Sequence, residues 1–174
     1  MQIRPATPDD IPAIAAIYGE AVRTGTASFE LEPPTPQDML GRFSAIQAGG
    51  YPYLVAREEA DGALLGYAYA SAFRPRIAYR FTVENSVYVD PAAQGRGVGR
   101  ALMDALIVRC TDAGFRQMVA VIGGSDNVGS IALHRACGFY DAGVLKATGF
   151  KFGRWLDTVL MQRELGEGDR TPGA

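Results

Sequence analysis

Gln94-Gly95-Arg96-Gly97-Val98-Gly99-Arg100 is a glycine-rich turn near the middle of the chain. The β-like run 85–90 precedes it, and a helical run, 98–113, follows it. A turn that opens a helix presents unpaired backbone N–H groups, and the positive end of the helix dipole, to one point. Glycine permits positive φ and a close approach of the ligand. With two arginines beside it, this turn predicts a phosphate-binding site.

Two common phosphate-binding motifs do not fit this spacing. A P-loop needs Lys-Ser or Lys-Thr directly after its glycines, and neither follows here. The dinucleotide fingerprint G-x-G-x-x-G needs glycine where Arg100 stands, and an acidic residue about 20 residues later at a strand end. The strand expected at 117–122 lacks that acid. Another kind of phosphate-bearing ligand is therefore indicated.

The pattern Gln94-x-x-Gly97-x-Gly99 resembles the signature of the GNAT superfamily of acyl-CoA N-acyltransferases. Residues 3–6, 82–89, 130–134 and 151–157 resemble the branch that acetylates phosphinothricin and methionine sulfoximine. The resemblance extends over nearly the whole chain, to about residue 165. It implies the GNAT fold, with a twisted, mostly antiparallel sheet that splays at the cofactor site. It also implies acetyl-CoA as co-substrate, no metal and a homodimer.

The composition is that of a single folded domain. With 174 residues and 48% hydrophobic content, the chain has enough apolar surface for one core. We expect the domain at 1–165 and a disordered polar tail at 166–174. The net charge of −2 argues against a nucleic-acid partner. No apolar run suits a membrane span and no signal-peptide pattern opens the chain, so a cytoplasmic protein is expected. Cys110 and Cys137 lack metal-ligand spacing and are expected to be buried thiols.

Hydrophobic periodicity and turn residues predict an α/β (α+β) fold with a mixed sheet flanked by helices. Thr7 and Pro8 are typical of a helix start, and Gly49-Gly50 of a helix end. Asp126 or Asn127 is expected to cap a later helix. The expected helices are 7–22, 36–48, 98–113 and 127–137, and the expected strands are 1–5, 53–56, 64–72, 79–90, 117–122, 139–145 and 152–162.

Glu84 is the candidate general base. Acetyl transfer to an amine requires the amine to lose a proton, because an alkylammonium with a pKa of about 10 has no free lone pair at neutral pH. Glu84 interrupts a strand rich in Phe, Val, Thr and Tyr, where a carboxylate is unfavourable unless it is paired or functional. A solvent-facing acid on an edge strand is the alternative. The resemblance implies that Glu84 accepts the proton, directly or through water.

His134, the chain's one histidine, is the candidate acid that protonates the leaving thiolate. In the wider superfamily a tyrosine often stands at this helical position, and this chain departs from that pattern. A hydrogen-bonded helix histidine with no catalytic role is the alternative. Tyr140 is a weaker candidate for the same role and is expected to pack.

The resemblance implies a cofactor site made of a strand, the glycine turn and one helix cap. The strand is expected to contribute backbone groups, which a splay would free for the thioester carbonyl and the pantetheine amides. Asn127 would reach the pantetheine arm, although its role as a helix cap already explains it. The two arginines are phosphate partners or ordinary surface charges. The expected cofactor residues are Val87, Tyr88, Val89, Gln94, Gly95, Arg96, Gly97, Val98, Gly99, Arg100 and Asn127.

The acceptor site is expected around the loop that enters the strand of Glu84. Arginine binds a carboxylate through two parallel hydrogen bonds, which suits a free amino acid. A solvated arginine loop is the alternative. Phe29 would form an apolar wall for a short side chain. The expected acceptor residues are Phe29, Arg74, Arg76, Tyr79, Glu84 and Asn85.

These observations predict an acetyl-CoA-dependent N-acetyltransferase that acts on the α-amine of a small amino acid or analogue, by direct transfer in a ternary complex. Phosphinothricin and methionine sulfoximine or sulfone are the leading acceptors. The same chemistry on a protein N-terminus, a polyamine or an antibiotic is one alternative. A non-catalytic acyl-CoA-binding module is another. The segment 151–157, with the chain's one tryptophan, is expected in the core or at a subunit interface.

Overall fold

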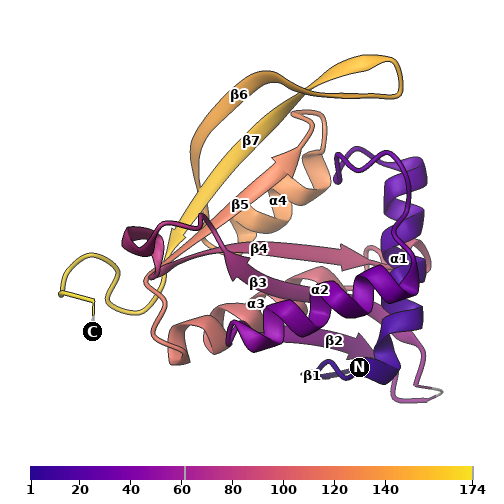
Figure 1. Ribbon diagram of the computed structural model, residues 1–174, viewed down its shortest axis with the longest axis horizontal. Coiled ribbons are helices and arrows are strands. Elements are labelled where there is room, and N and C mark those ends of the chain that lie inside the picture. Colours follow the sequence, from indigo (N-terminus) through magenta and orange to yellow (C-terminus); the bar gives the residue numbers. More distant parts are fainter. Residues whose placement is uncertain (61, 174) are drawn as a thin grey trace.

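The computed structural model describes residues 1–60 and 62–173, where seven strands form one sheet with four α-helices packed against it (Figure 1). The strand order is β1-β2-β3-β4-β5-β7-β6, and among these strands only β4 and β5 are parallel neighbours. The predicted mixed, mostly antiparallel sheet is therefore confirmed. The strands are β1 (Gln2–Pro5), β2 (Tyr53–Arg57), β3 (Leu64–Ala72), β4 (Thr82–Val89), β5 (Gln117–Gly123), β6 (Tyr140–Lys151) and β7 (Arg154–Glu164), and the helices are α1 (Ile11–Thr24), α2 (Pro36–Ala48), α3 (Val98–Asp112) and α4 (Val128–Ala136).

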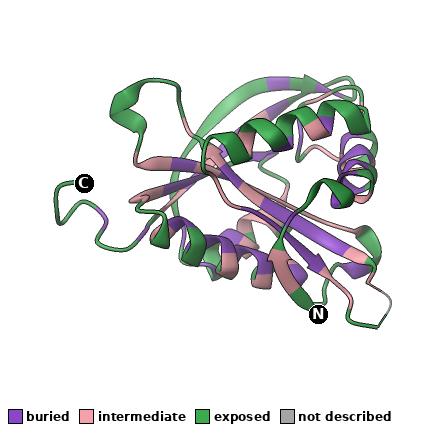
Figure 2. Cartoon of the chain, turned by 60° about the horizontal axis from the view of Figure 1, so that its bottom comes forward, coloured by how far each residue is buried: buried purple, intermediate pink, exposed green. Residues whose placement is uncertain are grey.

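Two hydrophobic cores lie on opposite faces of the sheet. Helices α1 and α2 cover one face, where Ile14, Val22 and Phe43 pack near Tyr67. Helix α3 covers the other face, where Leu102 is completely buried, and α4 lies beside it. Apolar residues three and four apart form these helical stripes, as the sequence predicted. Both faces of the central strands are therefore buried (Figure 2).

Strand β4 sends alternate side chains to the two cores. Tyr88 packs with the α1 and α2 core, whereas Val83 and Val87 pack with the α3 core. Because side chains alternate along a strand, Glu84 faces the α1 and α2 side and Asn85 faces the α3 side. Neighbours in the sequence thus serve different sides of the sheet.

The parallel pair β4–β5 is short and then opens. Thr82 to Asn85 pair with Gln117 to Ala120, and the ladder ends there. Strand β5 continues to Gly123, paired with β7 on its other side. The last four residues of β4 therefore have no partner on the β5 side. This is the splay that the resemblance implied.

Some predicted boundaries were wrong. The strand expected to begin at Tyr79 begins at Thr82, because Ile77–Tyr79 forms a 3-10 turn. The strand expected to end at Leu145 continues to Lys151, past a break in register between Leu145 and Gly149. Local sequence preference is weak at both points, and Gly149 stands at the second.

Asp61, between the strands expected at 53–56 and 64–72, lies outside the described residues. Residues 166–169 form a turn after the end of β7, and Arg116 donates a hydrogen bond from Nη2 to Thr171 Oγ1 at 2.9 Å. Residue 174 lies outside the described residues, and the domain limit at 165 stays a prediction.

The β6–β7 hairpin ends the sheet. Strand β6 is its edge strand and is exposed along most of its length, unlike the central strands (Figure 2). Within the described residues, no helix is long and apolar enough to cross a membrane.

Candidate active site

The glycine turn has the backbone geometry of an anion site. Gly95 and Gly97 have φ of 73° and 81°, which favours glycine, and Gly97 is the N-cap of α3. A Cβ on Gly97 would meet nothing within 4 Å, so the space in front of the helix start is open. Val98, only 2% exposed, anchors the first turn in the core. The first N–H groups of α3 have no partner within the helix and can bind a phosphate oxygen.

Both arginines of the turn are engaged with carboxylates. Arg96 pairs with Glu58, and Arg100 donates from Nε to Asp104 at 2.7 Å. Arg100 also donates from Nη1 to the Ala136 carbonyl at 2.6 Å. Exposed ion pairs of this kind contribute about 0–1 kcal/mol each. Such pairs are readily exchanged for a phosphate.

A cleft of about 490 Å³ runs from this turn to the splayed strands. Its walls include every predicted cofactor residue except Arg96, which lies paired to Glu58. A small cavity of about 50 Å³ continues the cleft between β4 and β5. The cofactor residues predicted far apart in the sequence therefore line one continuous space. The residues that line the cleft are Val87, Tyr88, Val89, Gln94, Gly95, Gly97, Val98, Gly99, Arg100 and Asn127.

The last residues of β4 direct their backbone N–H and C=O groups alternately to β3 and to the splay. The Asp90 N–H donates to the Leu65 carbonyl at 2.9 Å, and the Phe73 N–H donates to the Thr82 carbonyl at 3.4 Å. Because hydrogen-bonding groups alternate in an antiparallel ladder, the even-numbered residues of β4 bond to β3. Val87 and Val89 then point their backbone groups into the splay. The prediction that Tyr88 offers free backbone groups is therefore wrong, because its N–H and C=O face β3 and bond to that strand.

Asn127 connects the cleft to α4. It is the N-cap of this helix, and its Oδ1 accepts a hydrogen bond from the Ser130 N–H at 3.2 Å. The predicted cap is therefore confirmed. The same side chain borders the cleft and the small cavity, so it can cap the helix while its amide faces a ligand.

Glu84 is a half-buried carboxylate on the α1 and α2 side of the sheet. Burial raises the pKa of its carboxyl above the ordinary value of 4.5. In the described residues no hydrogen bond or ion pair engages this side chain, so its oxygens are available to a proton donor. Tyr69, which the sequence analysis missed, lies near enough for the Glu84 charge to raise the pKa of its phenol, after the larger effect of burial. A raised pKa and free lone pairs suit a general base.

His134 is 2% exposed and bonded at both ring nitrogens. Its Nδ1 lies 2.8 Å from the Ser130 carbonyl oxygen, which can only accept, so Nδ1 carries the hydrogen. Its Nε2 lies 2.9 Å from Asn85 Nδ2 and, in the neutral ring, accepts from that amide. Burial lowers the pKa of the imidazole, partly offset by the Ser130 hydrogen bond. The neutral ring has no proton on Nε2 to give, so this geometry favours a positioning role, and catalysis by His134 stays a prediction.

The structure does not support the prediction that Asn85 binds the acceptor. Its side chain is 6% exposed on the α3 side of the sheet, between His134 and Met103. Glu84 lies on the opposite side, so the Asn85 amide does not face an acceptor bound there. Because side chains alternate along a strand, the sequence positions of Glu84 and Asn85 already predict that they face opposite sides of the sheet.

The predicted acceptor residues do not lie together. Arg74, Arg76 and Tyr79 are exposed in the loop before β4, and in the described residues neither arginine has an acidic partner. Phe29 packs instead near Gly123, at the far end of β5. Val119, beside Glu84, is four residues from Gly123, a span of about 13 Å. The arginine loop and Phe29 thus lie on opposite sides of Glu84 along the strands.

Known proteins agree with this architecture. The protein-family model described as "Acetyltransferase (GNAT) family" matches residues 14–139 of this chain. The chain is 58% identical to the phosphinothricin N-acetyltransferase of Alcaligenes faecalis, over 97% of this chain and 85% of that protein. It is 45% identical to the L-methionine sulfoximine/L-methionine sulfone acetyltransferase of Pseudomonas paraeruginosa, over 94% of each. A phosphinothricin acetyltransferase from Sinorhizobium meliloti, solved in complex with AcCoA, superimposes with a TM-score of 0.96 at 55% identity, over 99% of this chain and 92% of that one.

The chain therefore belongs to the GNAT acetyltransferase family. Its fold, with the splayed pair and the glycine turn at a helix start, is the architecture of that class. Within the class it is an N-acetyltransferase similar to the phosphinothricin and methionine sulfoximine enzymes. Among the described residues, no cluster of His, Cys, Asp and Glu suits a metal ion.

Proposed function

We propose that this enzyme transfers the acetyl group of acetyl-CoA to the α-amine of a small amino acid analogue, with phosphinothricin and methionine sulfoximine or sulfone as the leading acceptors. The observation that supports this proposal most strongly is the cleft that connects an open helix N-terminus with the splay beside Glu84. The relatives that act on these acceptors support the choice, because they match nearly the whole chain. Arg74 and Arg76, which have no acidic partner within the part of the chain that the structure describes, provide cations for an acceptor carboxylate.

The residues suit direct transfer in a ternary complex. The α3 N-terminus binds the diphosphate, with the turn arginines exchanging their carboxylate partners for phosphate oxygens. The free backbone groups of Val87 and Val89 hold the pantetheine and the thioester carbonyl. Glu84 takes a proton from the acceptor ammonium, and the amine nitrogen then attacks the thioester carbon. The intermediate collapses as the carbon–sulfur bond breaks, and the second proton lost by nitrogen passes to the thiolate.

A panel of acceptors tests the substrate class. Purified enzyme with acetyl-CoA would be assayed against phosphinothricin, methionine sulfoximine, methionine sulfone, a polyamine and short peptides with free N-termini. We expect acetylation of the amino acid analogues and little of the peptides and the polyamine. Strong activity on peptides alone would overturn the proposed acceptor class while leaving the acetyl-CoA site intact.

We also propose a cytoplasmic homodimer. Acetyl-CoA is a charged molecule that does not cross membranes unaided, which supports an enzyme in the compartment where it is made. A cluster of exposed aromatic side chains lies on the β6–β7 hairpin, and such clusters are typical of protein interfaces. This supports a dimer in which a second copy of the chain buries the cluster. The cluster consists of Phe150, Phe152 and Trp155, which are 56%, 57% and 67% exposed.

A further inference from the structure

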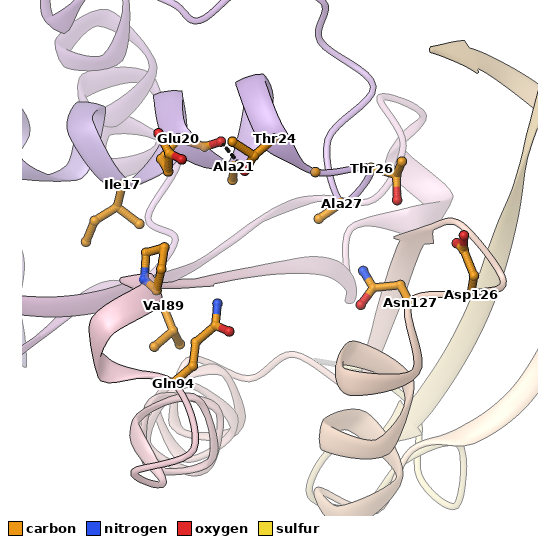
Figure 3. Close-up of a pocket in the computed structure, with 12 residues that line it drawn as sticks. Ile17, Glu20, Ala21, Thr24, Thr26, Ala27, Val89, Gln94, Asp126 and Asn127 are labelled. Carbon is orange, nitrogen blue, oxygen red and sulfur yellow. Dashed lines mark hydrogen bonds between the residues drawn. The ribbon is translucent and has the colours of Figure 1, made fainter. Parts of the chain in front are cut away.

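Two loops meet at the mouth of the cleft. Residues 25–30 follow α1, and residues 123–127 join β5 to α4. Ala27 and Asn127, one from each loop, border the main cleft, the small cavity in the splay and a third cavity of about 370 Å³. Figure 3 shows both residues among those that line the third cavity, Ala27 after α1 and Asn127 at the start of α4. The positions of both loops therefore set the width of the passage to the reacting centre.

The first loop is fastened by a buried ammonium. Lys151, at the end of β6, is 2% exposed and donates from Nζ to the Ser28 carbonyl at 2.9 Å. Burial lowers the pKa of this ammonium, and the nearby charge of Glu30 acts in the opposite direction. The Phe152 ring lies 5.0 Å below the same charge. A buried cation is costly unless it is engaged, so this lysine is tied to the loop it contacts.

The second loop is fastened by a carboxylate. Asp157, on β7, accepts hydrogen bonds at Oδ2 from the Ser125 hydroxyl and from Lys146 Nζ, both at 2.9 Å. Its backbone carbonyl accepts from the Gly124 N–H at 2.9 Å. Its Oδ1 accepts from the N–H of Ala147, which has a positive φ of 53°. The donors lower the pKa of Asp157 to about 2, led by the Lys146 hydrogen bond, so the carboxylate is charged in the working range.

The two side chains that bond the loops belong to one hairpin, β6–β7. Lys151 and Asp157 stand on either side of its turn, and Gly149 of the same hairpin packs closely on the Phe29 ring of the first loop. The first loop also contacts the second, because the Thr26 carbonyl lies against Gly123. We propose that Lys151 and Asp157 are positioning residues that hold the two loops in place over the acetyl end of the cofactor cleft. The hairpin then prepares the cleft before acetyl-CoA arrives.

This inference rests on the proposed cofactor cleft, and it predicts a particular kinetic signature. A loosened loop must be ordered when acetyl-CoA binds, so the cost falls on cofactor binding rather than on the chemical step. We expect Lys151→Met and Asp157→Ala to raise the KM for acetyl-CoA about tenfold each, with kcat at saturation changed less than about threefold. Methionine keeps the length and apolar stem of the lysine.

Hydrogen exchange distinguishes positioning from general destabilisation. Lys151→Met should speed amide exchange at residues 25–30, and Asp157→Ala should speed it at 123–127, with the sheet amides unchanged. Lys146→Met is the matched control, because Lys146 is 76% exposed and, among the described residues, the only hydrogen bond or ion pair of its side chain is to Asp157. Its KM and exchange should stay near wild type. Melting temperatures verify that each variant is folded.

The outcomes separate this inference from the proposed function. If wild-type protein binds CoA and both variants match the control in KM and exchange, the positioning roles are overturned while the cofactor cleft stands. If both variants lose protection throughout the sheet, Lys151 and Asp157 serve general stability and the inference also falls. If wild-type protein fails to bind CoA, the proposed cleft itself is wrong.

Discussion

At the scale of single residues, the site depends on the side of the sheet that each side chain faces. Glu84 and Asn85 are neighbours in the sequence but lie in different environments: one is a half-buried carboxylate with free oxygens, the other an amide bonded to His134. Only Glu84 has the position and the raised pKa of a base.

Glu84→Gln removes the proton acceptor with little change in size. We expect kcat to fall about 10²–10⁴-fold, because general base catalysis contributes that much, while CoA affinity stays within about twofold. Steady-state kinetics and calorimetry with CoA provide the two numbers. Glu32→Gln, at an exposed carboxylate, serves as the control and should behave as wild type. Unchanged kcat in Glu84→Gln would exclude the carboxylate as the base.

The pH dependence of the rate follows from the same carboxylate. The base acts only when ionised, and burial raises its pKa above 4.5, so kcat/KM should fall as the pH drops through that raised value. The acid limb is therefore expected at a higher pH than an ordinary glutamate would give. A pH profile of the residual activity of Glu84→Gln should lack that limb. The same limb in the variant would assign it to another group.

At the scale of elements, the start of α3 combines two properties in one turn. The positive φ of Gly97 directs the chain into the helix, and the open space in front of Gly97 leaves the helix N–H groups accessible. A side chain there would strain the backbone and also fill the space for the diphosphate. Gly50, with φ of 76° and open space around its Cβ position, shares the first property but lies away from the cleft.

Gly97→Ala and Gly50→Ala separate backbone strain from ligand binding. Both should lower the free energy of unfolding by about 1 kcal/mol, because each places Cβ in the left-handed region. Only Gly97→Ala should weaken CoA binding, by about tenfold or more, since its methyl group enters the phosphate site. Chemical denaturation and calorimetry measure the two effects. Equal CoA affinities in the two variants would contradict the proposed role of the turn.

At the scale of the whole molecule, the β6–β7 hairpin contains both the exposed aromatic cluster and the side chains that contact the cleft loops. Its outer side chains form the aromatic cluster, whereas its Lys151 and Asp157 contact the cleft loops. An edge strand of this length with exposed apolar side chains favours association. A partner on the hairpin would therefore also support the element that fastens the loops.

Trp155→Glu tests the dimer directly. We expect the wild-type protein to sediment as a dimer at micromolar concentration and the variant to sediment as a monomer, because a carboxylate would be buried without a partner in the interface. Val108→Glu, at a 57% exposed apolar residue on α3, is the control and should remain dimeric. A monomeric wild-type protein would remove the homodimer from the proposal.

Much of the fold was predictable because its signals are local. The glycine turn, the cap at Asn127 and the helix of residues 36–48 depend on neighbouring residues, whose conformational preferences act within a few positions of the chain. The boundary errors arose where local preference is weak, at the 3-10 turn 77–79 and at the register break in β6.

The candidate site was predictable only in part. From the sequence alone, the glycine turn at a helix start, the order of helices and strands, and Glu84 as a carboxylate within a strand could be predicted. The tertiary structure decided that Asn85 faces His134, that Phe29 lies away from the arginine loop, and that one hairpin contacts both loops of the cleft. Those arrangements depend on strand pairing and on contacts between residues as many as 123 positions apart, which no local pattern specifies.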